Sequence, residues 1–440
     1  MNNKKWMAIL LGGIMAASLA APCSVSAAEK TTLTFWHAMG GTNGEVLQQI
    51  VDDFNASQDE IEIKAEYQGT YDDTITKLKA AMQSDSGLPD VCQMYDVGTK
   101  FMYDSGAVIP VEDKFESTGY DKSSVMEVIS SYYTVDGKPY AMPFNVSTPM
   151  LYYNKDVFEA AGLDPETPPT TYDEVLEDSK KIVESGAAPV GYSQAIYGWF
   201  FEQQLAGLGV TYGNNDNGRK EAVTAVDFDS NGGGLKVFDM WKKLYDSGYF
   251  EDYGTTTADT QTAFFSGQVG MIIESTAILK NAVDSSPFEV GTGYLPRIEQ
   301  NDEGGVIIGG GSLWLTDTGN EANEDAAWKF IEYITTPDVQ AKWSMGTGYF
   351  AINEKAYETE DMKAYLKENP NFETAINQLK DSPVNCNTAG VLSGVQTEAR
   401  LTFNEIMPQV YDGKLTTQDA VDQLAASVNK AIENYNESIK

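Results

Sequence analysis

The stretch LTFWHAMGGTNGEVLQQIVDDF, residues 33–54, decides the fold because it joins a strand pattern to a helix pattern. Residues 33–37 form a short apolar run typical of a strand, and apolar residues then recur with helical spacing. We expect Thr42 or Asn43 to cap this helix, since short polar side chains accept hydrogen bonds from its first free amides. The predicted inward face of the helix consists of Val46, Ile50, Val51 and Phe54.

The same alternation continues along the chain. Residues 61–63 begin a second strand, residues 71–82 have a helix pattern, and residues 90–95 form a third strand. Strands that alternate with helices predict an α/β fold, with a parallel sheet covered by helices on both faces. Ligands of such sheets bind beyond the carboxyl ends of the strands. The polar residues expected at this edge are His37, residues 68–71 and Asp96.

The rest of the chain predicts a second lobe, because residues 29–440 exceed what one hydrophobic core usually organises. Capping patterns at Thr171 and Thr416 each begin an amphipathic helix. Two segments, residues 143–149 and 306–312, are interpreted as crossings between the lobes. The three glycines of the second segment permit the dihedral changes of a hinge, and an ordinary tight turn is the alternative.

The first 28 residues have the pattern of a cleaved signal peptide. Lys4 and Lys5 precede an apolar run of 14 residues, which is shorter than the roughly 20 residues of a membrane span. Small residues before Glu29 fit cleavage there. The alternative is a lipoprotein anchored at Cys23, although Pro22 departs from the small flexible residue expected at that position. Both alternatives predict an exported protein, in the periplasm or at the extracellular cell surface.

The formal net charge of −35 at pH 7 bears on the partners of this protein. Such an acidic surface repels nucleic acid and anionic lipid and favours a soluble monomer. For Cys92 and Cys386, both a disulfide and two free thiols fit the sequence. The sequence has no His/Cys cluster, no metal-ligand spacing and no nucleophile beside a base, so we expect no metal, no cofactor and no catalysis. A secreted phosphodiesterase is the remote alternative.

Seven short motifs follow one another along the chain. They are Phe35-Trp36-His37, Tyr67-Gln68-Gly69-Thr70-Tyr71, Tyr95-Asp96-Val97-Gly98, Pro143 to Pro149, Leu151 to Asp156, Ile307 to Trp314 and Thr347-Gly348-Tyr349. Together they resemble the extracellular solute-binding proteins of ABC importers, and within them the glycerol-3-phosphate-binding branch, which is maltose-binding-protein-like. The similarity runs from about residue 31 to about residue 435.

The resemblance implies two α/β lobes joined by three hinge crossings, with the ligand in the cleft between them. It implies an N-terminal lobe of residues 29–147 plus 312–352 and a C-terminal lobe of residues 148–311 plus 353–440. It also implies hinge closure around the ligand and docking on the membrane subunits of an ABC importer.

The resemblance further assigns seven ligand residues. Tyr71 and Asp96 stand where the family handles the glycerol hydroxyls. The residues that surround the ligand, chiefly its phosphate, are Ser147, Ser275, Gly310, Tyr349 and Arg400. The set suits such a ligand, because a guanidinium offers a planar fork of donors to phosphate oxygens and a carboxylate accepts from hydroxyls.

Two positions depart from this branch. Asp96 stands where the branch commonly has glutamate, and Ile196 stands at the position of a tryptophan, which leaves room for a larger ligand. The expected ligand is therefore glycerol-3-phosphate or a glycerophosphodiester, with a sugar or oligosaccharide as the alternative. Further candidate cleft-lining residues are Trp36, His37, Ile196, Tyr197, Trp199 and Trp314. For the tryptophans and the histidine, a structural role in the core is the alternative.

Overall fold

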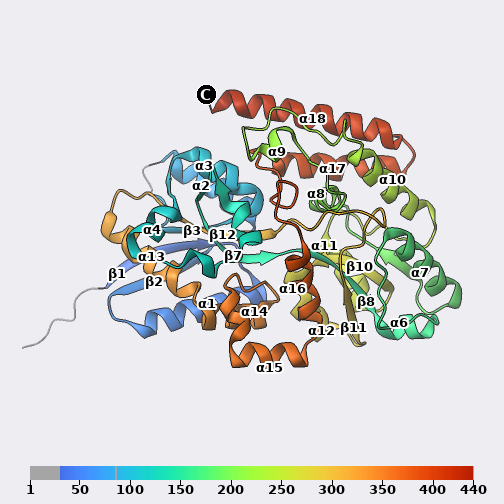
Figure 1. Ribbon diagram of the computed structural model, residues 1–440, viewed down its shortest axis with the longest axis horizontal. Coiled ribbons are helices and arrows are strands. Elements are labelled where there is room, and N and C mark those ends of the chain that lie inside the picture. Colours follow the sequence, from blue (N-terminus) through green and yellow to red (C-terminus); the bar gives the residue numbers. More distant parts are fainter. Residues whose placement is uncertain (1–29, 85–86, 440) are drawn as a thin grey trace, which may run out of the picture.

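The chain folds into two lobes, each built around its own β-sheet (Figure 1). The computed structural model describes residues 30–84 and 87–439. The expected signal peptide at residues 1–28 and the alternative lipid anchor at Cys23 lie outside the described residues. The prediction of a two-lobed α/β fold is confirmed.

The first lobe contains a six-stranded sheet in the order β2-β1-β3-β12-β4, with β7 also paired to β12. Its strands are β1 (Thr31–His37), β2 (Ile61–Tyr67), β3 (Val91–Tyr95), β4 (Val108–Ile109), β7 (Met142–Ser147) and β12 (Gly309–Thr316). β1 pairs in parallel with both β2 and β3, as the alternation of strands and helices predicts. β12 runs antiparallel to β3, and its Gly311 lies opposite Tyr95. The start of β12 therefore meets the carboxyl ends of the parallel strands at one edge.

Helices flank this sheet. They are α1 (Gly41–Ser57), α2 (Tyr71–Met82), α3 (Thr99–Ser105), α4 (Val111–Thr118), α13 (Glu321–Ile334) and α14 (Pro337–Thr347). The buried residues of α1 are Leu47, Ile50, Val51 and Phe54, while Val46 is half-buried. The expected cap at Thr42 or Asn43 is wrong, because the helix begins at Gly41 with Gly40 as its N-cap. Gly41 has a φ of +54°, which glycine adopts freely, so the chain turns into the helix before it reaches the polar residues.

The second lobe contains a four-stranded sheet in the order β11-β8-β10-β9. Its strands are β8 (Pro149–Asn154), β9 (Val190–Ser193), β10 (Val269–Ser275) and β11 (Val290–Gly293). The helices on this side are α6 (Lys155–Ala160), α7 (Tyr172–Ser185), α8 (Gly198–Gly207), α10 (Gly233–Asp246), α11 (Thr257–Phe265), α16 (Asn371–Asp381), α17 (Gln396–Tyr411) and α18 (Thr417–Ser438). The predicted capping box at the start of α7 is confirmed, with Thr171 and Glu174 each accepting from the other's backbone amide.

Smaller elements complete the chain. They are α5 (Glu127–Ser130), β5 (Thr134–Val135), β6 (Lys138–Pro139), α9 (Asn214–Gly218), α12 (Leu279–Ser285), α15 (Glu360–Glu368), η1 (Asp96–Gly98), η2 (Lys122–Ser124), η3 (Ser131–Tyr133), η4 (Thr276–Ile278) and η5 (Glu354–Glu358). Within residues 30–84 and 87–439, no helix has the length and apolar character of a membrane span.

The chain first crosses between the two sheets at a single residue. Thr148 alone separates β7 of the first sheet from β8 of the second. The carbonyl of Thr148 accepts from the amide of Thr276 at 2.8 Å, which ties the crossing to the end of β10. The chain later returns from β11 to the first sheet through β12. The lobe boundaries implied by the resemblance stay a prediction.

The two cysteines of the described chain are free thiols, so the disulfide alternative is not formed. Cys92 is buried in β3, and Cys386 is partly exposed. Burial raises the pKa of the Cys92 thiol to about 12. Because the thiolate is the reactive form, Cys92 behaves as an inert apolar residue of the core.

Candidate functional site

Asp96 and Arg400, two of the expected ligand residues, meet between the lobes although 304 positions separate them. Asp96 follows β3 directly and begins η1, and Arg400 lies on the buried side of α17. Nη2 of Arg400 donates to Oδ2 of Asp96 at 2.8 Å. The exposed fractions of the two side chains are only 8% for Arg400 and 6% for Asp96. A buried ion pair therefore bridges the lobes at the edge where the strand pattern predicts the ligand.

Glu202 of α8 completes this group of charges. Its carboxylate accepts from Nε of Arg400 at 2.8 Å and from Nη2 at 2.7 Å. Gln396 donates to the same carboxylate at 3.0 Å. Asp96, Glu202 and Arg400 are called the charged cluster below. Glu202 is not among the residues expected from the sequence, although a signal exists: it is an ionisable residue in a helix that is buried on nearly all sides.

Burial couples the charges of the charged cluster. It raises the pKa of Glu202, because the carboxylate loses its hydration, while Arg400 opposes this shift. Burial also acts to lower the pKa of Arg400, but Asp96 and Glu202 raise it well above its ordinary value. The guanidinium therefore stays charged. Two acidic side chains therefore share this one cation.

Three more of the expected residues lie against Asn145 in β7, two at its side chain and Gly310 at its backbone. Nδ2 of Asn145 donates to the hydroxyl of Tyr71 at 2.7 Å. The side chain of Tyr349 lies within hydrogen-bonding reach of both Asn145 and Tyr71. Gly310 has a φ of +87°, and a Cβ there would stand 1.8 Å from the carbonyl oxygen of Asn145. Asn145, which is not among the expected residues, thus connects three residues that the resemblance selects.

The two expected serines end strands on either side of the crossing at Thr148. Ser147 is the buried last residue of β7 and lies opposite Gly309 of β12. Ser275 is the half-buried last residue of β10, and its Oγ accepts from the amide of Ala277 at 3.1 Å. The structure therefore places six of the expected residues at strand ends or in helices around the junction of the lobes, and Tyr349 in the segment that follows α14. Their contact with a ligand stays a prediction.

Tyr197 and Trp199 lie beside this junction, and Ile196 directly precedes them in the chain. Tyr197 precedes α8, and burial raises its pKa to about 12 while Arg400 opposes the shift. Trp199 is buried, and its ring packs on Gly309, where a Cβ would stand 2.6 Å from Cζ2. Ile196 is 1% exposed and belongs to the core of the second lobe.

The other three candidates have structural surroundings. Trp36 is half-buried, and its Nε1 donates to Glu66 of the neighbouring strand at 3.0 Å. Trp314 is completely buried in the core of the first lobe, three residues along β12 from Gly311. Nδ1 of His37 accepts from the amide of Met39, and burial lowers the pKa of His37 to about 4. For each of these three residues, the contacts fit a structural role, which is the alternative to lining the ligand cleft.

Additional hydrogen bonds join the lobes around the charged cluster. The hydroxyl of Tyr95 lies 2.5 Å from Oγ1 of Thr397 on α17, and it also donates to Oδ1 of Asp72 at 3.0 Å within the first lobe. The hydroxyl of Tyr435 on α18 donates to Oδ2 of Asp104 on α3 at 2.6 Å. These contacts come from residues far apart in sequence, and no local pattern predicts them.

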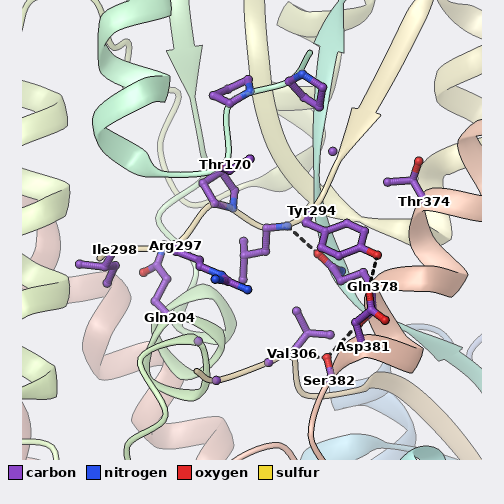
Figure 2. A pocket seen from close by; sticks show the side chains of 18 of the residues that line it. Thr170, Gln204, Tyr294, Arg297, Ile298, Val306, Thr374, Gln378, Asp381 and Ser382 are labelled. Carbon is purple, nitrogen blue, oxygen red and sulfur yellow. Dashed lines mark hydrogen bonds between the residues drawn. The ribbon is translucent and has the colours of Figure 1, made fainter. Parts of the chain in front are cut away.

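A cavity of about 520 Å³ lies elsewhere, against the second lobe (Figure 2). Its walls include Pro168, Thr170, Gln204, Tyr294, Arg297 and Asp381. Figure 2 shows the side chain of Arg297 between those of Gln204 and Val306. On another part of the wall, the hydroxyl of Tyr294 donates to Asp381 at 2.7 Å. None of the seven expected residues lines this cavity. We favour the charged cluster as the candidate site, because its groups come from both lobes and can respond to lobe closure.

Within the part of the chain that the structure describes, no group of three or more His, Cys, Asp or Glu side chains is arranged to hold a metal ion. The charged cluster offers carboxylate acceptors, guanidinium donors and neighbouring hydroxyls. Such groups bind and orient a polar solute through hydrogen bonds.

Comparisons with known proteins identify the family of this chain. Residues 49–374 match the family model of the bacterial extracellular solute-binding proteins. The sn-glycerol-3-phosphate-binding periplasmic protein UgpB of Shigella flexneri serotype 5b (strain 8401) is 31% identical over 417 residues, which cover 93% of this chain and 94% of that protein. The protein of the same name from Escherichia coli (strain K12) is 30% identical over the same shares of both chains.

Solved structures show the same fold. The cyclic alpha-maltosyl-1,6-maltose binding protein from Arthrobacter globiformis has a TM-score of 0.76 and 26% identity, covering 92% of this chain and 100% of that chain. UgpB from Mycobacterium tuberculosis, solved in complex with glycerophosphocholine, has a TM-score of 0.79 and 20% identity, covering 92% and 99%. The family match and the identity over most of both chains lead to one conclusion: the chain belongs to the bacterial extracellular solute-binding protein family.

Proposed function

We propose that this protein is the substrate-binding subunit of an ABC importer and holds a small, hydroxyl-rich solute at the charged cluster. The contact between Asp96 and Arg400 supports this most, because it joins the two lobes at the predicted ligand edge. A ligand that bridges such groups stabilises the closed arrangement relative to the open one. The protein's residues bind and orient the solute, and the importer's membrane subunits then accept the closed form.

A phosphorylated glycerol derivative is the first candidate ligand. The relatives that cover most of the chain are named for binding sn-glycerol-3-phosphate. In this proposal Asp96 and Tyr71 bind the glycerol hydroxyls, and Arg400 lies at the phosphate end. The remaining expected contacts are Ser147, Ser275, Gly310 and Tyr349, which supply neutral donors.

A sugar is the second candidate, and Glu202 favours it. Two carboxylates form ion pairs with the single guanidinium of the charged cluster. Carboxylates accept hydrogen bonds from hydroxyl groups, which a sugar presents in several directions. The structural relative from Arthrobacter globiformis is named for binding cyclic alpha-maltosyl-1,6-maltose.

Titration calorimetry with glycerophosphocholine, glycerol-3-phosphate, maltose and inorganic phosphate tests this function. We expect at least one of the first three to bind with a Kd below about 1 mM, corresponding to roughly 4 kcal/mol of binding free energy. Free phosphate, which has no hydroxyl-rich body, is the control and is expected to release little heat. No binding by any of the three organic ligands contradicts the proposal. Turnover of glycerophosphocholine by the pure protein would contradict a purely binding role.

The proposal extends to assembly and location. We propose that the protein acts as an exported monomer, because its net charge of −35 opposes self-association. Light scattering of the secreted protein is expected to give the mass of one chain. Mass spectrometry of its N-terminus distinguishes cleavage before Glu29 from a lipid-modified Cys23.

A further inference from the structure

Glu202 lies where it determines which ligands Arg400 can hold. A guanidinium has five N–H donors and offers two edges for a forked contact, one with Nε and Nη2 and one with Nη1 and Nη2. Glu202 fills the first edge with its two oxygens, at 2.8 and 2.7 Å. Asp96 takes a donor of the second edge through Nη2, at 2.8 Å. Of the three guanidinium nitrogens of Arg400, Nη1 alone has no hydrogen bond to a described residue, so neither edge is free for a forked phosphate contact.

The contact between Glu202 and Arg400 belongs to the second lobe alone. It joins α8 to α17, and these helices pack so closely that a Cβ on Gly198 would stand 2.5 Å from Cα of Arg400. Gln396, one turn before Arg400, also donates to Glu202. Asp96, by contrast, comes from the first lobe. Opening of the lobes therefore separates Asp96 from Arg400 but leaves Glu202 in place.

A third buried acidic side chain, Glu274, lies in the surroundings of the charged cluster and is 5% exposed. Burial raises the pKa of Glu274, while hydrogen bonds from Gln261 and from the amide of Ser275 oppose this shift. Arg219, the other arginine of this region, already donates to the backbone carbonyls of Tyr132, Ala389 and Gly390. A second anionic group entering this buried region meets repulsion that water screens poorly.

We infer that Glu202 makes this site selective for ligands without net charge and excludes phosphate monoesters such as glycerol-3-phosphate. The inference rests on the proposed function and narrows its substrate class to sugars, polyols and zwitterionic glycerophosphodiesters. A neutral hydroxyl-rich ligand donates to the carboxylates and accepts from Nη1 without displacing Glu202. A phosphate monoester must compete with Glu202 for the fork, which leaves a buried carboxylate without its cation.

Titration calorimetry at pH 7.5 with maltose, glycerophosphocholine and glycerol-3-phosphate tests the inference on the wild type and two variants. Glu202→Gln keeps the size of the side chain and an acceptor for Arg400 but removes the charge. Glu398→Gln is the matched control, because Glu398 is exposed on the same helix as Arg400. We expect the wild type to bind maltose or glycerophosphocholine at least tenfold more tightly than glycerol-3-phosphate. Glu202→Gln is expected to raise the affinity for glycerol-3-phosphate at least tenfold and to change that for the neutral ligand less than threefold, while the control changes neither.

The outcomes separate the inference from the proposed function. The inference is overturned if the wild type binds glycerol-3-phosphate more tightly than both neutral ligands. It is also overturned if Glu202→Gln changes the affinity for all ligands equally. In both cases the proposed function still stands. Absence of binding by folded wild type overturns the proposed function, and the inference falls with it. If Glu202→Gln does not fold, the wild-type preference decides, and Glu202→Asp, which retains the charge, is expected to keep that preference.

Discussion

Arg400 is the cation that forms ion pairs with the two buried carboxylates of the charged cluster. Arg400→Ala leaves Glu202 and Asp96 without it, and we expect the free energy of unfolding to fall by about 3–5 kcal/mol. Removing the charge of Glu202 in the same chain relieves part of this penalty, so Arg400→Ala with Glu202→Gln is expected to be more stable than Arg400→Ala. Denaturant unfolding at pH 7 measures both variants. Strictly additive losses would contradict the coupling between the two residues.

His37 gives the fold a dependence on pH. Burial lowers the pKa of His37 to about 4 from an ordinary value of 6.5. The unfolded chain therefore binds a proton near pH 6.5, and the folded chain does so only near pH 4. The contribution of neutral His37 is fully present above pH 6.5 and is lost as the pH falls toward 4, by up to about 3 kcal/mol.

Denaturant unfolding of the wild type and His37→Asn at pH 7, 6 and 5 checks this dependence. The carboxylates titrate in both proteins, so the difference between the two curves isolates the imidazole. We expect the stability of the wild type to fall more steeply than that of the variant. Parallel pH profiles would show that His37 is freely protonated in the folded protein.

At the scale of elements, the start of β12 depends on Gly310. A residue with a side chain at this position would have to adopt a φ of +87°. Its Cβ would also stand 1.8 Å from the backbone carbonyl oxygen of Asn145 in β7. We expect Gly310→Ala to lower the free energy of unfolding by at least about 3 kcal/mol, because the two strands must separate. Gly319→Ala is the control, since Gly319 has a φ of +69° with nothing within 4 Å of a Cβ. Its cost is expected to be about 1 kcal/mol, and equal losses at the two positions would contradict the close approach at Gly310.

Local patterns predict the elements better than they predict the site. The strands and helices between residues 31 and 95, and the capping box of α7, follow from spacing and from side chains near their own backbone. The start of α1 is missed because a left-handed glycine overrides the polar capping residues. Glu202 is missed because its partner lies 198 positions away on another helix. Sequence alone shows that an ionisable residue stands in an apolar helix, and only the fold shows what neutralises it.

At the scale of the whole molecule, hydrogen bonds between the lobes set the balance between closed and open forms. Tyr435→Phe removes the hydrogen bond from Tyr435 of α18 to Asp104 of α3, which does not involve the charged cluster. We expect this variant to have a larger radius of gyration than the wild type without ligand, and saturating ligand to restore the wild-type value. Small-angle scattering measures both. Tyr294→Phe, which loses a hydrogen bond to Asp381 at the cavity of Figure 2, is the control and is expected to leave the radius unchanged.

The position of the bound solute is the most direct test of a binding site at the charged cluster. A crystal structure with the ligand that binds most tightly in calorimetry would locate it. We expect ligand density between the lobes, within hydrogen-bonding distance of Asp96 and Arg400, with Glu202 still hydrogen-bonded to the guanidinium. Ligand density confined to the cavity lined by Tyr294 and Arg297, with the charged cluster unchanged, would contradict it.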